Sequence, residues 1–80
     1  MTKPLAVITG ASSGIGEATA KAFSNAGYPT LLLARRIELM ESFNLKNSIC
    51  KKIDVRDRDA LVSAIREAEK QYGPTDMMFN

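Results

Sequence analysis

The chain has 80 residues, of which 45% are hydrophobic and 25% charged, and its formal net charge is +2. This composition is typical of a soluble globular protein with a single domain, and the small charge, without interleaved aromatic and basic residues, argues against a nucleic-acid partner. No apolar run approaches the roughly 18 residues of a membrane span, and the N-terminus lacks the apolar core of a signal peptide. The single cysteine, Cys50, cannot form an internal disulfide, which favours a reducing compartment. We therefore expect a cytoplasmic protein.

The first predicted strand is an apolar run at residues 5–9 without alternation, which is typical of a strand buried on both faces of a parallel sheet. A glycine-rich turn follows and leads into a helix over residues 15–26, which Gly27 should end as a left-handed C-cap. We assign the apolar face of this helix to residues at helical spacing, namely Ile15, Ala18, Thr19, Ala22, Phe23 and Ala26. Strand, glycine turn and helix N-terminus together favour phosphate binding, because the unpaired N–H groups there stabilise an anion.

A second buried strand is predicted at residues 30–34, after Pro29, whose missing N–H costs least at the start of a strand. Arg35 and Arg36 end this run. A short helix follows, and the side chains that we expect to face the sheet are Ile37, Met40 and Phe43.

The third predicted strand, residues 48–55, has an apolar pattern that Lys51 and Lys52 interrupt, which places it at the margin of the sheet, because lysine commonly protects an unpaired strand edge. Asp57 then caps a third helix, which Gly73 and the following proline end. Its apolar residues are Leu61, Ala64, Ile65, Ala68 and Tyr72. Residues 76–80 begin a fourth strand. The order βαβαβαβ predicts an α/β fold of three layers with a parallel sheet, because such crossovers are right-handed almost without exception.

The glycine-rich turn carries the first candidate cofactor-binding residues. Gly10 can adopt the backbone angle of a tight turn, Gly14 lets a phosphate approach the main chain, and Gly16 lets the helix lie close to the strand. A Walker-type loop is excluded, because the last glycine is followed by Glu17 instead of lysine. The spacing alone leaves a plain turn and helix cap open. The full candidate set here is Gly10, Ser12, Ser13, Gly14, Ile15 and Gly16.

Thr-Gly-Ala-Ser-Ser-Gly-Ile-Gly at positions 9–16 closely resembles the Thr-Gly-x3-Gly-x-Gly signature of the short-chain dehydrogenase/reductase family. Three further stretches resemble landmarks of that family in the same order: the end of its second strand at 33–36, its third-strand Asp-Val at 54–55, and the strand before its Asn-Asn-Ala-Gly motif at 76–80. The resemblance implies a Rossmann-type sheet in the order 3-2-1-4, as the N-terminal half of a larger doubly wound fold. It also implies an oxidoreductase that transfers a hydride between a nicotinamide cofactor and a carbonyl/alcohol pair.

The end of the second strand predicts which cofactor is bound. In a dinucleotide fold the adenosine ribose lies beside this point, where an acidic residue binds the hydroxyl groups of NAD. This chain has Arg35 and Arg36 there, and a guanidinium can bind a 2′-phosphate through two charge-assisted hydrogen bonds. We therefore predict that the cofactor is NADP(H), with NAD(H) as the less favoured alternative. The remaining alternative is that the two arginines are simply exposed to solvent and bind no cofactor.

The resemblance adds three cofactor-site residues. Asp54 corresponds to the aspartate that accepts a hydrogen bond from the adenine amino group, with the backbone of Val55 beside it; the alternative is a strand-end residue that caps a turn. Asn80 corresponds to the first asparagine of the Asn-Asn-Ala-Gly motif, a residue that mainly ties neighbouring strands together.

The catalytic residues of the family, a serine and a tyrosine four residues before a lysine, are absent. Tyr28 is followed four residues later by Leu32 and Tyr72 by Asp76, and the sequence has no histidine and suggests no metal site. We therefore expect residues 1–80 to be the N-terminal part of one NADP(H)-binding domain of a longer reductase, and to be inactive alone. The alternatives are a non-catalytic NADP-binding module and a truncated fragment without activity.

The expected partner of the longer protein is a small carbonyl or alcohol substrate. The fourth strand is apolar, and an apolar strand edge favours pairing with another chain. We therefore expect a homo-oligomer.

Overall fold

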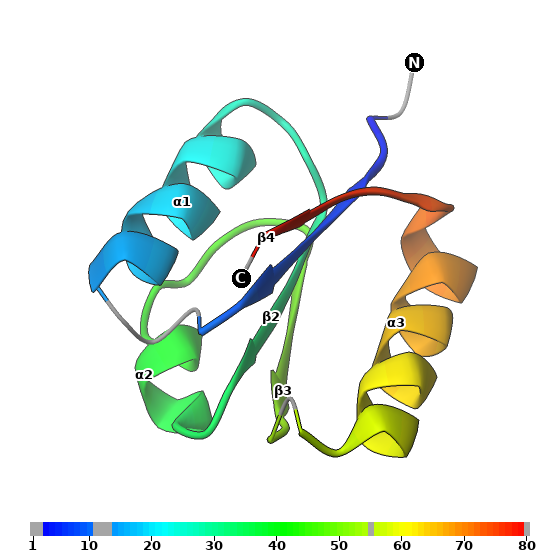
Figure 1. Cartoon of the computed structure of the whole chain (residues 1–80). Helices are drawn as coiled ribbons and strands as arrows, with labels where there is room; N and C mark the ends of the chain where they lie inside the picture. Colours follow the sequence, from blue (N-terminus) through cyan, green and yellow to red (C-terminus); the bar gives the residue numbers. More distant parts are fainter. Residues whose placement is uncertain (1–2, 11–13, 55, 80) are drawn as a thin grey trace.

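The computed structural model describes residues 3–10, 14–54 and 56–79, and these form a parallel sheet with helices on both sides (Figure 1). The strands lie in the order β3-β2-β1-β4, with α1 and α2 on one side of the sheet and α3 on the other. The elements are β1 (Leu5–Thr9), α1 (Gly14–Asn25), β2 (Thr30–Ala34), α2 (Ile37–Glu41), β3 (Ser48–Lys52), α3 (Arg58–Tyr72) and β4 (Thr75–Phe79). The predicted α/β class and the order 3-2-1-4 are confirmed.

The two central strands, β1 and β2, are buried along their whole length. Because successive side chains of a strand point to opposite faces, they supply two separate cores. One core, against α3, contains Leu5, Val7, Leu31, Leu33, Ala64 and Ala68. The other, on the side of α1 and α2, contains Ile8, Ala20, Leu32, Ala34 and Met40, with Ile37 and Phe43 packed against it. The expected sheet-facing residues of α2 and α3 are thereby confirmed.

Strand β3 lies at one margin of the sheet, as its lysines predict, but it ends at Lys52 and not at residue 55. Ile53 still donates its N–H to the carbonyl oxygen of Ala34, at 3.1 Å. The chain then turns, and the N–H of Asp57 donates to the carbonyl oxygen of Asp54 at 2.8 Å. The predicted strand was too long because an apolar pattern continues to residue 55, whereas pairing with β2 stops where that strand ends.

The predicted apolar face of α1 is wrong. Ile15 is 85% exposed, and Ala18, Ala22 and Ala26 are exposed as well. The buried residues of α1 are Gly16 and Ala20. Alanine and threonine are found on either face of a helix, so their spacing does not predict which face of α1 is buried. Gly16 and Ala20 face the sheet because their small size lets the helix approach it closely.

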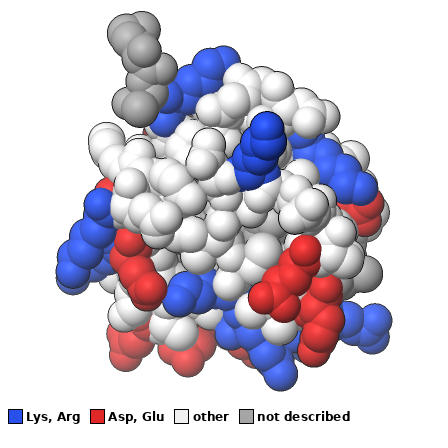
Figure 2. All heavy atoms as spheres, turned by 180° about the vertical axis from the view of Figure 1, so that it is seen from behind, with Lys and Arg blue, Asp and Glu red and all other residues white. Residues whose placement is uncertain are grey.

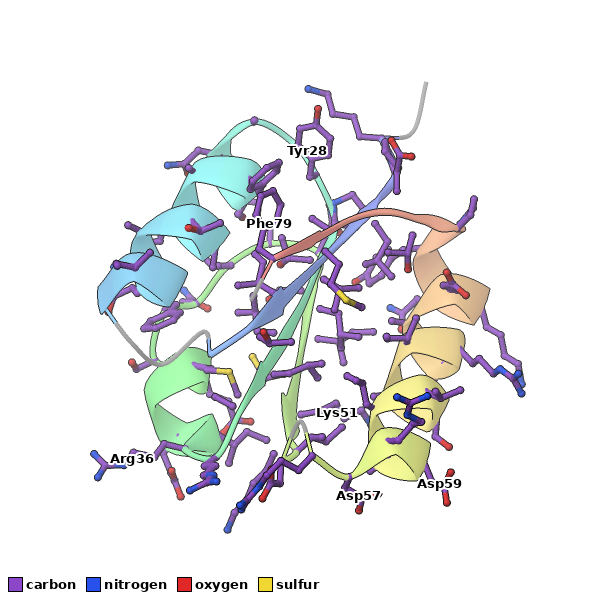
Figure 3. All side chains as sticks on the ribbon, viewed as in Figure 1. Tyr28, Arg36, Lys51, Asp57, Asp59 and Phe79 are labelled. Atoms are coloured by element: carbon purple, nitrogen blue, oxygen red, sulfur yellow. The ribbon has the colours of Figure 1, made fainter. Side chains whose placement is uncertain are left out.

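Gly27 ends α1 as predicted, with φ of +92°. Its N–H donates to the carbonyl oxygen of Ser24, and the N–H of Tyr28 donates to that of Phe23, each at 3.0 Å. This pair of hydrogen bonds is the Schellman motif, and the ring contact that often accompanies it is present between Phe23 and Tyr28, with centroids 5.2 Å apart. Phe23 also lies against Phe79, whose ring is seen near Tyr28 in Figure 3.

Helix α3 has the predicted ends. The Asp57 carboxylate accepts a hydrogen bond from the N–H of Ala60 at 3.2 Å, and Gly73 follows the last turn with φ of +92°. Lys51 projects from β3 toward α3 (Figure 3), where its Nζ lies 3.3 Å from Oε1 of Glu67. One of the two lysines that mark the edge strand therefore also ties that strand to the helix behind it.

Candidate cofactor-binding site

All the strand pairs are parallel, so the carboxyl ends of β1, β2 and β3 meet at one edge of the sheet. A cleft of about 470 Å³ lies at this edge. It is lined by residues that follow three different strands: Gly10 after β1, Arg35 and Arg36 after β2, and Asp54 and Arg56 after β3. Leu33, Ala34 and Ile53 complete the lining that the described residues provide. The structure thus brings together Gly10, Arg35, Arg36 and Asp54, which the sequence predicted as parts of one site.

Gly10 has φ of +65°, the left-handed conformation that a tight turn after a strand requires. Among the described residues, no atom lies within 4 Å of a Cβ atom built on Gly10 or on Gly14. The described part of the chain therefore leaves room for a ligand to approach the main chain at both glycines.

A second, smaller cleft of about 200 Å³ begins at Gly10 and continues along the first turn of α1. Its lining includes Ile15 and Gly16, so these predicted residues share a cleft with Gly10, and Phe79 lines it as well. Ser12, Ser13, Val55 and Asn80 lie outside the described residues.

Arg35 and Arg36 differ in position. The Arg35 side chain is 72% exposed, and its Nη2 lies 3.6 Å from Oδ2 of Asp54. Arg36 is the N-cap residue of α2 and makes no capping hydrogen bond with its side chain, which points outward from the fold in Figure 3. Arg35 is therefore the arginine of the pair that faces the third strand.

The Asp54 carboxylate is held mainly by Arg56. The Arg56 Nη2 donates to Oδ2 at 2.7 Å, and its Nε lies 3.1 Å from Oδ1 and 3.2 Å from Oδ2. Oδ1 also accepts the backbone N–H of Arg56 at 3.0 Å. Hydrogen bonds from Arg56, followed by the charges of Arg56 and Arg35, hold the pKa of the Asp54 carboxyl well below its usual range. Asp54 thus has the turn-capping role that was the alternative in the sequence, and its contact with adenine stays a prediction.

Sequence reasoning missed Arg56. The available signal was the Asp-x-Arg spacing directly after the third strand, because an aspartate commonly accepts a hydrogen bond from the backbone two residues on. That turn brings the Arg56 side chain back over the carboxylate. The site therefore contains a third guanidinium beside Arg35 and Arg36.

Together these features define a Rossmann-type α/β domain. The parallel order β3-β2-β1-β4, the left-handed glycine after β1 and a cleft at the carboxyl ends of the strands recur in such folds, which take their ligands at this edge.

The family model described as short chain dehydrogenase matches residues 4–80, and the chain belongs to this oxidoreductase family. It is 39% identical over 80 residues to the glycine betaine reductase ATRR of Emericella nidulans, an alignment that covers 92% of this chain and 6% of that protein. A 3-ketoacyl-(acyl-carrier-protein) reductase from Brucella melitensis, complexed with NADH, superposes with a TM-score of 0.84 at 25% identity, over 96% of this chain and 33% of that one. An actinorhodin polyketide ketoreductase variant with NADPH gives a TM-score of 0.84 at 24% identity, over 100% of this chain and 34% of that one. The chain therefore spans at most about a third of these proteins.

Within the described ranges, no helix is long and apolar enough to cross a membrane, and no group of three or more His, Cys, Asp or Glu residues could hold a metal ion. On the face drawn in Figure 2, basic and acidic side chains are interspersed along the lower part, and single basic side chains stand on the otherwise uncharged upper part. Charge on that face is thus mixed in sign.

Proposed function

We propose that the protein is an NADP(H)-dependent oxidoreductase that acts on a small carbonyl or alcohol substrate, and that these 80 residues hold the adenosine and phosphate part of the cofactor. The observation that carries the cofactor preference is the position of Arg35. It follows β2 directly, lines the cleft at the carboxyl edge of the sheet, and stands where an acidic residue would bind the ribose of NAD.

The residues present fit such a cofactor. Gly10 lies in a left-handed turn, α1 begins at Gly14 and its N-terminus favours an anion, and Arg35 and Arg36 supply donors for a phosphate. The nicotinamide cofactor supplies or accepts the hydride when bound. The chain itself carries neither the serine nor the Tyr-x3-Lys of the family, so we propose that it binds the cofactor without turning over substrate alone.

The solved relatives do not decide the preference, since one was determined with NADH and another with NADPH. Arg35 can be tested directly. We expect Arg35→Asp to weaken NADPH binding far more than NADH binding, because a carboxylate repels the 2′-phosphate and accepts hydrogen bonds from ribose hydroxyl groups.

The measurement is a fluorescence titration of the protein with NADPH and with NADH. Arg66→Asp is the matched control, because it makes the same charge change on the exposed surface of α3, outside the cleft. Equal losses for the two cofactors in Arg35→Asp would contradict the proposed preference.

A further inference from the structure

The cleft at the carboxyl edge of the sheet has an unequal charge balance. Three guanidinium groups and one carboxylate line it, which leaves two net positive charges among Arg35, Arg36, Arg56 and Asp54. A phosphate monoester carries about 1.5 to 2 negative charges at pH 7. The cleft therefore has the charge to match one phosphate group, provided that the Asp54 carboxylate does not pair with the arginine that binds the phosphate.

Arg56 and Asp54 form the closest ion pair in this cleft. The guanidinium contacts both carboxylate oxygens, with its shortest contact at 2.7 Å, and the backbone N–H of Arg56 donates to Oδ1 of the same carboxylate. Side-on pairs of this kind combine charge with fixed geometry. Arg56 therefore both neutralises Asp54 and fixes its direction.

Arg35 meets the same carboxylate less closely. Its Nη2 lies 3.6 Å from Oδ2, which is outside hydrogen-bond distance, and its side chain is 72% exposed. Oδ2 already accepts the shorter hydrogen bond from Arg56. The Arg35 guanidinium is thus near Asp54 but is not held by it.

We propose that Arg56 is a positioning residue that determines specificity for a 2′-phosphorylated cofactor. It holds and neutralises Asp54, and so leaves Arg35 available to the phosphate. Without Arg56, the Asp54 carboxylate would pair with Arg35 and repel the incoming phosphate across the same cleft. This inference rests on the proposed NADP(H) preference and adds to it a residue that acts through another.

The test compares adenosine 2′,5′-bisphosphate with 5′-AMP, which differ only in the 2′-phosphate. Isothermal titration calorimetry gives both dissociation constants, and their ratio is the preference for the 2′-phosphate. We expect Arg56→Gln to lower this ratio about tenfold, because the Asp54 carboxylate is then no longer neutralised by Arg56 and repels the nearby 2′-phosphate dianion. The double variant Arg56→Gln/Asp54→Asn should recover the ratio, because the repelling charge is gone. Arg58→Gln, which removes a nearby arginine outside the cleft, should leave the ratio unchanged.

The outcomes separate the two proposals. A wild-type protein without preference for the 2′-phosphate refutes the NADP(H) assignment, and this inference with it. A wild-type preference that Arg56→Gln leaves intact overturns the role of Arg56 alone. If the ratio for the double variant stays as low as for Arg56→Gln, the positioning role is also overturned, because Arg56 would then contact the phosphate directly. Circular dichroism spectra of the variants show whether they are folded before the ratios are compared.

Discussion

Gly10 allows the clearest test of how the fold and the site are joined, because a second glycine provides a matched control. Gly10 has φ of +65° and Gly73 has φ of +92°, and a Cβ atom on either would meet no atom of residues 3–10, 14–54 and 56–79 within 4 Å. Only Gly10 lines the cleft. Alanine at either position therefore adds backbone strain without a steric clash, and the two substitutions differ in their distance from the site.

The expected loss of stability is at least as large for Gly73→Ala as for Gly10→Ala. A left-handed conformation costs an L-residue about 1–2 kcal/mol, and the reduced freedom of the unfolded chain returns about 0.4–1 kcal/mol. Gly10→Ala should destabilise the protein by about 1 kcal/mol, which lowers the Tm of a unit of about 60–100 residues by about 4–8 °C. Gly73→Ala should cost about 1–3 kcal/mol, because its φ of +92° with ψ of −175° is a conformation that almost only glycine adopts. Thermal unfolding followed by circular dichroism measures this loss.

The expected effects on cofactor affinity differ. We expect alanine at position 10 to relieve its strain by rotating the adjoining peptide, which would remove one hydrogen bond to the phosphate in the proposed binding mode. The loss of one charge-assisted hydrogen bond is worth about 1.5–3 kcal/mol, or roughly a 10- to 100-fold weaker Kd for NADPH. Gly73→Ala should leave the Kd unchanged. Equal effects of the two substitutions on NADPH affinity, measured by fluorescence titration, would refute the assignment of Gly10 to the binding turn.

Two further predictions concern stability. Leu32 is fully buried in the core on the side of α1 and α2, so Leu32→Ala should lower the free energy of unfolding in urea by about 3 kcal/mol. Val62→Ala, at an exposed position of α3, should change it by less than about 0.5 kcal/mol. Similar urea midpoints for the two variants would contradict the assignment of Leu32 to the core. The Glu69 carboxylate accepts a hydrogen bond from the backbone N–H of Thr75 at 2.8 Å, and this hydrogen bond lowers the pKa of Glu69. The ionised carboxylate therefore stabilises the fold above the ordinary glutamate pKa of about 4.3. This stabilisation is lost as the pH falls through the lower pKa of the folded protein. Glu69→Gln should therefore lose less stability than the wild type between about pH 5 and pH 3, and superimposable Tm curves would exclude this role.

Much of the site follows from the sequence because its parts lie at the ends of strands. Gly10 and Arg35 each come directly after a buried strand, Asp54 comes two residues after the edge strand β3, and parallel strands bring such positions to one edge. Arg56 was not predicted, because its contribution depends on a turn that folds its side chain back over Asp54. The exposure of Ile15 was not predicted either, since the rotation of α1 depends on which residues allow it to approach the sheet.

The sequence by itself determined the order of the elements, the parallel arrangement and the helix ends, because these depend on local residues such as Gly27, Asp57 and Gly73, whose backbone angles or hydrogen bonds involve only near neighbours. The tertiary structure decided which face of α1 is buried, where β3 stops and how the cleft is charged. The face of α1 and the end of β3 depend on contacts between segments distant in the chain. In the cleft, Asp54 pairs with Arg56 within a local turn, whereas Arg35 comes within 3.6 Å of Asp54 only because β2 and β3 end at the same edge of the sheet.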